Sequence, residues 1–406
     1  MKITHIHIER FRGFQNEDFE VGSLLTAIAG QNGTQKSTLL GIITQTFTLK
    51  TEDSMRVEKP LCGGSYISAF KDKFRLSPTF DKPKGHEWTI SFDAGMDDFT
   101  VESIKRTGDP NVRFWKKGAR QEGDGYISFP TIFLSLKRLV PVAEEAKIIT
   151  DDTLLTQEEL NEFKQLHNKI LIAQTPISSA TTITSKNKQS IGVSTELYDW
   201  NQNSMGQDNL GKIILALFSF KRLHDKYPRQ YKGGILAIDE MDATMYPASQ
   251  VELLKVLRKY ASKLNLQILF TTHSMSLLKA MDDLVQEVTK KEETANQAKI
   301  LYLKKVDDKI AIKQGVNFKG IQLDLNVVAE GNNRKKNRIT AYTEDKENIL
   351  FVKAILKSKA FVLDFVDVTL PCSTLMELVT KRVPAFIYPY SIVTVSYTHL
   401  TLPTTS

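Results

Sequence analysis

Apolar and polar residues alternate with different periods along this chain, and the changes of period mark the elements that we expect. The isoleucines of residues 1–8 are spaced by mostly polar residues, which predicts a half-buried strand. Residues 10–14 break this pattern as a turn. Residues 19–29 then predict more strand, continuously apolar at its end, and residues 39–47 predict a helix.

The next segment, residues 51–125, is polar and strand-like, with turn-forming clusters at residues 81–86 and 107–110. Stretches such as residues 87–92 alternate in the manner of a strand. We therefore expect an antiparallel β subdomain here, and a buried strand after it at residues 130–139.

Helical and extended patterns follow one another in the next part of the chain. Apolar residues recur at helical spacing in residues 156–173, whereas the Ser- and Thr-rich residues 175–194 predict a loop or a mobile lobe. An apolar helix is expected at residues 210–223. Short apolar runs at residues 235–238 and 267–270 predict two more buried strands. The pattern is that of an α/β fold.

Composition narrows the class of protein. The 406 residues are 41% hydrophobic and 25% charged, which is ordinary for a soluble chain of two or three domains. No run reaches the ~18 apolar residues of a membrane span, so we expect a cytoplasmic protein with no membrane partner. Lys and Arg exceed Asp and Glu by 54 to 47, which permits a nucleic-acid partner. Cys62 and Cys372 lie far apart and are expected to stay reduced.

Residues 30–38, with the sequence GQNGTQKST, follow the apolar run and precede the predicted helix. Strand, glycine loop, Lys-Ser and helix is the order of a phosphate-binding P-loop. Glycines let backbone N–H groups curl around phosphates, and the helix N-terminus adds partial positive charge. Lys36 would then contact the β- and γ-phosphates, and Ser37 would bind Mg²⁺. The alternative is an ordinary turn between a strand and a helix.

Three side chains near this loop leave its use open. The residue before the lysine is normally glycine in this motif, but here it is Gln35. Its side chain must point away from the phosphates, or nucleotide binding is weakened. Arg10 and Arg12 could approach a nucleotide, although solvated edge-strand charges are the favoured interpretation.

Three further motifs follow. Ser204 to Gln207 precede an apolar helix, and their hydroxyl and free N–H groups suit a γ-phosphate, although a helix cap alone has the same pattern. Asp239 and Glu240 end a buried strand, where one carboxylate can hold Mg²⁺ and its neighbour can polarise a water. His273 ends the next strand, and a structural role is the alternative for it.

Taken together, this ordered set of motifs resembles the ABC-type ATPases, the branch that includes the SMC and RecF proteins. The resemblance implies ATP and Mg²⁺ as ligands, with Asp239 and Ser37 on the metal, Glu240 as the catalytic glutamate, and His273 as the switch histidine that senses the γ-phosphate. Residues 241–243 resemble the D-loop. It also implies a Walker A loop and a signature loop, whose nucleotide-binding residues are Gly30, Asn32, Gly33, Lys36, Ser37 and Thr38, and Ser204, Met205, Gly206 and Gln207.

The implied mechanism is an ATP sandwich, in which the signature loop acts on the nucleotide of the opposite subunit of a homodimer. About 165 residues separate the P-loop from Ser204, and they contain no sustained heptads. Long coiled-coil arms are therefore excluded, and a compact head is expected. No residue is assigned to the Q-loop glutamine.

Residues 133–139 and 242–247 are similar to the ATPase half of the OLD (overcoming lysogenisation defect) family, in which a TOPRIM nuclease domain follows. The resemblance implies an ABC-type ATPase domain at 1–330, with a helical or mobile lobe at about 151–200, a basic linker at 331–338, and a partial TOPRIM-like domain at 339–394. Glu344 is the candidate metal ligand and Glu347 the second choice, because nuclease cations need carboxylates. An acidic helix start is the alternative. The Asp-x-Asp of a TOPRIM site is absent.

Residues 395–406 match the translation of a sequencing-library adapter, so we expect the natural protein to be longer, with its nuclease carboxylates beyond about residue 390. The family resemblance implies a DNA-directed nuclease of phage defence, with a partner protein from a neighbouring defence gene. In this truncated form it would bind and hydrolyse ATP but not cut DNA. Two alternatives remain: a nucleotide-dependent dimerisation switch with little turnover, and a RecF-like DNA-repair ATPase.

Overall fold

The computed structural model describes residues 1–50, 53–66, 73–93, 95–105, 112–118, 125–139, 149–151, 154–173, 175–184, 189–331, 339–366, 368, 370–383, 386 and 391–394. Contacts divide the chain into two compact units, Met1–Gln322 and Leu323–Ser406, which are described separately. The predicted turn at 107–110, nearly all of the predicted linker and the predicted adapter segment lie outside the described residues.

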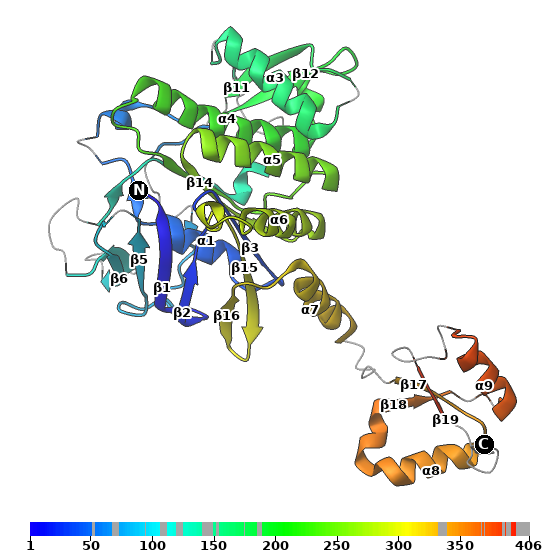
Figure 1. The fold of residues 1–406 in the computed structure, drawn as a ribbon. Coiled ribbons are helices and arrows are strands. Elements are labelled where there is room, and N and C mark those ends of the chain that lie inside the picture. Colours follow the sequence, from blue (N-terminus) through cyan, green and yellow to red (C-terminus); the bar gives the residue numbers. More distant parts are fainter. Residues whose placement is uncertain are drawn as a thin grey trace. The chain divides into compact units, whose positions relative to one another are not determined.

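The first unit is built on a six-stranded sheet (Figure 1). Five strands are parallel, and only the edge strand β16 runs antiparallel to its neighbour. Every residue of the three central strands is buried, which accounts for their continuous apolar runs. In order across the sheet the strands are β16 (Lys309–Lys313), β15 (Ala298–Val306), β3 (Leu25–Gly30), β14 (Leu266–Thr272), β13 (Gly234–Ile238) and β9 (Thr131–Leu134).

A second, antiparallel sheet covers one face of the first. Helix α1 (Lys36–Thr44) lies between the two sheets, because its leucines and isoleucines share one apolar core with both. The antiparallel subdomain and the strand at 87–92 are confirmed. In order the strands are β2 (Phe14–Glu20), β1 (Ile3–Phe11), β5 (Glu87–Phe92), β6 (Phe99–Lys105) and β7 (Val112–Lys116).

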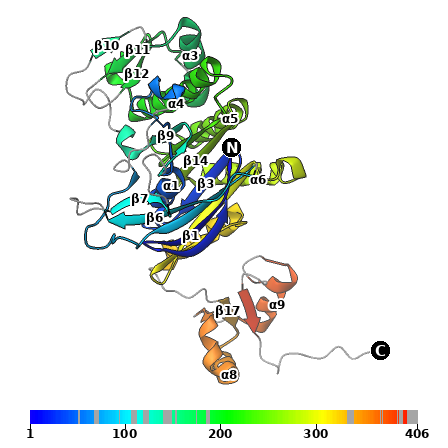
Figure 2. The same ribbon diagram turned by 90° about the vertical axis from the view of Figure 1, so that its left-hand side faces the viewer.

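A lobe packs against helix α4 (Met205–Lys226), and helix α3 (Gln157–Leu171) of this lobe also contacts α5 (Pro247–Lys263) (Figure 2). Helix α3 is joined in the lobe by an antiparallel sheet of β10 (Ile149–Asp151), β11 (Ser179–Thr184) and β12 (Gln189–Ser194). Of the two alternatives for residues 175–194, a loop or a mobile lobe, the loop is wrong for 179–184 and 189–194, because Thr is a good strand former and Ile183, Ile191 and Val193 are buried. The lobe is mixed rather than helical.

The remaining predictions for this unit give the right kind of element, although some observed bounds differ from the predicted ones. The helices expected at 39–47, 156–173 and 210–223 are confirmed as α1, α3 and α4. The strand expected at 130–139 ends at Leu134 and continues as the 3-10 helix η2 (Leu136–Leu139), because backbone N–H of Arg138 bonds back to the Ser135 carbonyl. The other elements are α6 (Met275–Val288), the paired strands β4 (Phe47–Thr48) and β8 (Ile127–Ser128), and the 3-10 helices η1 (Ser54–Val57), η4 (Trp200–Gln202) and η5 (Glu292–Thr294).

Helix α7 (Phe318–Gly331) spans the boundary between the units, which falls at 322 rather than at 330. The second unit contains a parallel three-stranded sheet in the order β18 (Leu363–Phe365), β17 (Ile339–Thr343) and β19 (Ser391–Thr394). Its helices are α8 (Lys346–Leu356), η6 (Lys357–Val362) and α9 (Cys372–Thr380). Among the helices of the described ranges, none has the length and apolarity to cross a membrane. Cys62 and Cys372 are free thiols.

His167 gives the lobe a testable dependence on pH. Its ring is buried in α3 and stacks on Phe163, and no described residue hydrogen-bonds to either ring nitrogen. Burial lowers the pKa of His167 from 6.5 to about 4, so the folded lobe binds this proton less well than the unfolded chain does. Its contribution to stability is complete above the unfolded pKa and is lost as pH falls toward 4.

We expect the difference in unfolding free energy between the parent and a His167→Leu variant to change by about 2 kcal/mol, in favour of the variant, between pH 7 and pH 5. Denaturant titrations monitored by circular dichroism at both pH values measure this difference. An unchanged difference would contradict the assignment of a neutral, buried ring.

Candidate nucleotide-binding site

The predicted P-loop lies between the end of a strand and the start of a helix, which is the position that phosphate binding requires. Strand β3 ends at Gly30, and α1 begins at Lys36. Lys36 Nζ donates to the carbonyl oxygens of Gly30 at 3.1 Å and Gln31 at 2.9 Å, so the loop curls around its own lysine. Burial lowers the pKa of Lys36, and this effect is opposed by nearby carboxylates, of which Glu240 has the largest influence.

Ser37 and Asp239 meet although they lie far apart in the sequence. Ser37 Oγ donates to Asp239 Oδ1 at 2.8 Å, and Thr271 Oγ1 donates to the same carboxylate oxygen at 2.7 Å. The strand that carries Thr271, β14, lies between β3 and β13. The carboxyl ends of these three parallel strands therefore bring a hydroxyl and a carboxylate together, as the sequence analysis expected for Mg²⁺.

Glu240 is held in an unusual backbone conformation. Its φ of 50° lies in the left-handed region, which is strained for a residue with a side chain. Its N–H donates to Thr271 Oγ1 at 2.6 Å, and its carbonyl accepts from Arg138 Nη2 at 2.8 Å. Neither Thr271 nor Arg138 was identified as a site residue from the sequence. The available signal was a polar residue at or just beyond the end of a buried strand.

His273 follows the end of β14 beside the same carboxylates. Its backbone N–H donates to both carboxylate oxygens of Asp242 at 3.4 Å. The pKa of His273 is lowered because the protein partly desolvates the ring, and the Lys36 ammonium adds to this effect. The ring is therefore neutral at pH 7, with one nitrogen able to donate a hydrogen bond and the other able to accept one.

The rest of the predicted Walker A residues have different surroundings. Asn32 and Gly33 are exposed on the loop, and Gly33 has a φ of 80°. At Gly30, an added Cβ would lie 2.5 Å from the Leu303 carbonyl oxygen, so close strand packing also requires glycine there. Thr38 Oγ1 accepts from Arg12 at 3.5 Å.

The signature-loop residues begin helix α4 and contact the loop after Glu240 rather than the P-loop. Ser204 Oγ accepts from Gln207 N–H at 3.3 Å and Gln207 Oε1 accepts from Ser204 N–H at 2.9 Å, a complete capping box. A Cβ added to Gly206 would lie 2.5 Å from the Thr244 carbonyl oxygen. These residues thus form a helix cap, which was the alternative interpretation of the motif. Met205, next to the cap, is 43% exposed.

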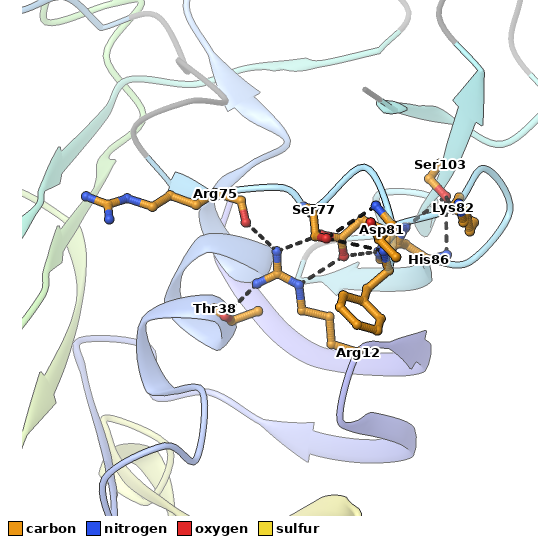
Figure 3. Close-up of polar contacts among 10 residues, drawn as sticks. Arg12, Thr38, Arg75, Ser77, Asp81, Lys82, His86 and Ser103 are labelled. Carbon is orange, nitrogen blue, oxygen red and sulfur yellow. Dashed lines mark hydrogen bonds and ion pairs between the residues drawn. The ribbon is translucent and has the colours of Figure 1, made fainter. Parts of the chain in front are cut away.

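Figure 3 shows a polar network beside α1 that includes Arg12. Arg12 donates to both oxygens of the buried Asp81 at 3.0 Å and to the Arg75 carbonyl at 2.8 Å. His86 Nε2 lies 3.0 Å from Asp81, whose pKa is lowered to about 2 by these hydrogen bonds against the opposing effect of burial. Arg12 is exposed, as expected, but its guanidinium is held by these partners rather than free in solvent. Arg10 does pair at the surface, with Glu87.

Gln35 caps α1 with a φ of 60°, where glycine is favoured. Its side chain turns toward the β1–β2 turn, since a Cβ added to Gly13 would lie 3.1 Å from Gln35 Nε2. No described residue donates a hydrogen bond to its buried Oε1 atom. Gln35 therefore combines a left-handed backbone conformation with a buried amide oxygen that lacks a described partner, and both store strain at the start of α1.

Glu344 and Glu347 belong to the second unit. Glu344 directly follows β17, and Asp345 caps α8 by accepting from Asn348 N–H at 2.7 Å. Within the described ranges, no group of three or more His, Cys, Asp and Glu side chains could hold a metal ion. A strand-end carboxylate is present, but a set of metal ligands around it is not among the described residues.

The fold and the site define an α/β protein of P-loop type, with the loop, two carboxylates and a histidine at one edge of a parallel sheet. A family model described as the AAA ATPase domain matches residues 135–278, which is less than half of the chain. No curated protein gives a significant match.

Several solved structures, of SMC head domains and of RecF, are similar to this chain at low identity. The SMC head domain from Thermotoga maritima is 14% identical, with 78% of this chain and 100% of that chain covered and a TM-score of 0.43. The Smc head with a coiled coil and joint from Pyrococcus yayanosii is 10% identical, with 81% and 99% covered and a TM-score of 0.46. The recombination mediator RecF with ATPrS is 12% identical, with 77% and 98% covered and a TM-score of 0.39.

A Gln35→Gly variant tests the strain at the loop. We expect it to be more stable by about 1 kcal/mol, because glycine adopts this φ without a steric penalty and removes the buried oxygen. Lys84→Gly is the matched control, because Lys84 has a φ of 63° in an exposed turn. Thermal unfolding of both variants measures the difference, and a loss of stability in Gln35→Gly alone would contradict strain at this position.

Proposed function

We propose that this chain is an ABC-type ATPase head that binds ATP with Mg²⁺ and hydrolyses it between two copies. The observation that carries the proposal is the 2.8 Å hydrogen bond from Ser37 to Asp239, with Lys36 close enough to these carboxylates for its pKa to respond to them. A P-loop hydroxyl and a strand-end carboxylate in contact form the half-site that a nucleotide-bound metal needs.

The residues present fit Mg²⁺. Ser37 and Asp239 offer the hard oxygen atoms that this ion prefers, and Ser37 is exposed at the helix start. When bound, the ion supplies neutralisation of the negative charge on the β- and γ-phosphate oxygens. Thr271 keeps the Asp239 carboxylate oriented through its own hydrogen bond.

The protein groups have separate tasks in hydrolysis. Lys36 holds the phosphates, and its cation favours the charge that develops on them. Glu240 accepts a hydrogen bond from the attacking water and aligns it with the γ-phosphate. The neutral His273 ring contacts the γ-phosphate and reports its presence. The start of α4, with Ser204, Met205, Gly206 and Gln207, engages the nucleotide of the second copy, and Ser204 and Met205 are its exposed members.

Two substitutions separate binding from turnover. Glu240→Gln removes the base but keeps the shape, so we expect ATP affinity to be retained while hydrolysis falls at least about 100-fold. Lys36→Ala removes the phosphate-binding cation and should abolish both. Phosphate release and equilibrium binding of Mg-ATP measure the two steps. Equal hydrolysis by the parent and by Glu240→Gln would overturn Glu240 as the base.

The sandwich predicts that each site uses residues of two copies. Met205→Glu places a carboxylate toward the phosphates of the opposite copy, so turnover should fall at least about 10-fold by charge repulsion. An equal mixture of Met205→Glu and Lys36→Ala chains should recover roughly a quarter of parental turnover. Half of the dimers are then mixed, and one of the two sites in each mixed dimer is intact. Met96→Glu, between β5 and β6, is the control, because Met96 is 41% exposed and is not among the proposed site residues. No recovery on mixing would contradict sites shared between copies.

A nucleotide switch with little turnover is the second candidate, and the observation that favours it is the strained Gln35 beneath the loop. A switch requires the parent chain to dimerise with ATP while its rate of hydrolysis stays near that of the Glu240→Gln variant. Sedimentation with ATP, compared with phosphate release, separates a switch from an enzyme.

We further propose an OLD-like role, in which this head directs a TOPRIM nuclease on DNA in phage defence beside a partner protein. The parallel sheet of the second unit, with Glu344 at the end of β17, supports it. A RecF-like repair role needs no nuclease carboxylate. Phage plating on cells with the native locus separates the two, because Glu344→Ala should abolish defence in the first case and have no effect in the second.

A further inference from the structure

We infer that Arg138 is a positioning residue that couples the start of helix α4 to the conformation of Glu240. The inference rests on the proposed function, because it assigns to α4 the contact with the second copy and to Glu240 the hydrolytic step. Arg138 would then link the binding of a second copy at α4 to the position of the Glu240 carboxylate in the same chain.

The Arg138 guanidinium joins three segments that are remote in sequence. Its Nε donates to Asn209 Oδ1 of α4 at 2.7 Å, and its Nη2 donates to the Glu240 carbonyl at 2.8 Å. Its Nη1 donates to the carbonyl oxygens of Leu134 at 3.2 Å and Ser135 at 3.1 Å, which fixes it to the end of β9. All four bonds end on uncharged oxygen atoms.

Helix α4 is seated on the same loop from its own side. Asn209 Nδ2 donates to the Ala243 carbonyl at 2.9 Å, so its amide bonds both to Arg138 and to the loop after Glu240. One turn earlier, Gly206 lies so close to the Thr244 carbonyl that no Cβ fits between them. A shift of the first turns of α4 therefore cannot leave residues 240–244 in place.

Both peptide groups of Glu240 are held by side chains, and this keeps its strained conformation in place. Thr271 binds the N–H and Arg138 binds the carbonyl, while φ stays at 50°. Loss of the Arg138 contact would let the peptide rotate toward an unstrained conformation and move the carboxylate away from the water it must align.

The site selects arginine over lysine. The side chain is buried, and burial lowers the pKa of Arg138 to about 10, while Asp239, Glu240 and Asp242 favour the cation. It stays charged at neutral pH. A planar group with several fixed donors can serve β9, α4 and Glu240 at once, whereas a single ammonium cannot.

Arg138→Lys and Asn209→Ala test the inference in the full chain. We expect kcat to fall between about 10-fold and 100-fold while the Kd for Mg-ATP and KM stay within about twofold, because the base is misplaced but the loop is intact. The kcat of the double variant should be no lower than that of the less active single variant, because both substitutions break the same connection. Arg222→Lys is the control, since Arg222 lies near the other end of α4 and pairs with Glu159 of α3.

The outcomes are distinct. Parental kcat in both single variants, with the parent active, overturns the inference and leaves the ATPase intact. Losses that multiply in the double variant also overturn it, because they indicate two independent effects. Weakened Mg-ATP binding with kcat retained indicates a purely structural role and overturns it as well. A parent that neither binds nor hydrolyses ATP overturns the proposed function and the inference together.

Discussion

The hydrogen bond between Ser37 and Asp239 depends on the order of strands in the central sheet. Parallel strands place all their carboxyl ends at one edge, and β14 separates the loop strand from the carboxylate strand by a single position. Thr271 on that middle strand bonds to Asp239 and accepts from Glu240. The site is thus a property of three adjacent strand ends, and a change of strand order would dismantle it without altering any motif.

The antiparallel sheet matters to this edge through helix α1. The helix is packed between two sheets, and Arg12 ties its Thr38 to the buried Asp81 of the antiparallel side. Loss of Arg12 would be costly, because the buried Asp81 carboxylate would lose this partner in a poorly solvated place. The P-loop is therefore supported from both layers rather than only from the strand that precedes it.

Sequence reasoning recovered what is encoded locally. The glycine loop, the apolar runs and the polar residues at their ends predicted the strands, the helices and the meeting of Lys36, Ser37, Asp239 and His273. It missed Arg138 and did not predict the contacts of Arg12, because a cation near the end of a strand looks the same whether it faces solvent or acceptors from other segments. It also missed β11 and β12, because Ser and Thr are equally typical of loops and of a small sheet such as this one, whose strand β12 packs against α4.

Helix α4 begins with a capping box in which Ser204 and Gln207 satisfy each other's backbone. Each such bond contributes on the order of 1 kcal/mol. The cap uses the Ser204 hydroxyl oxygen as an acceptor, so its O–H can donate to an incoming phosphate without breaking the cap. The proposed contact with a second copy would therefore leave helix α4 capped before and after it forms, and the helix start would need no rearrangement to take up or release a phosphate.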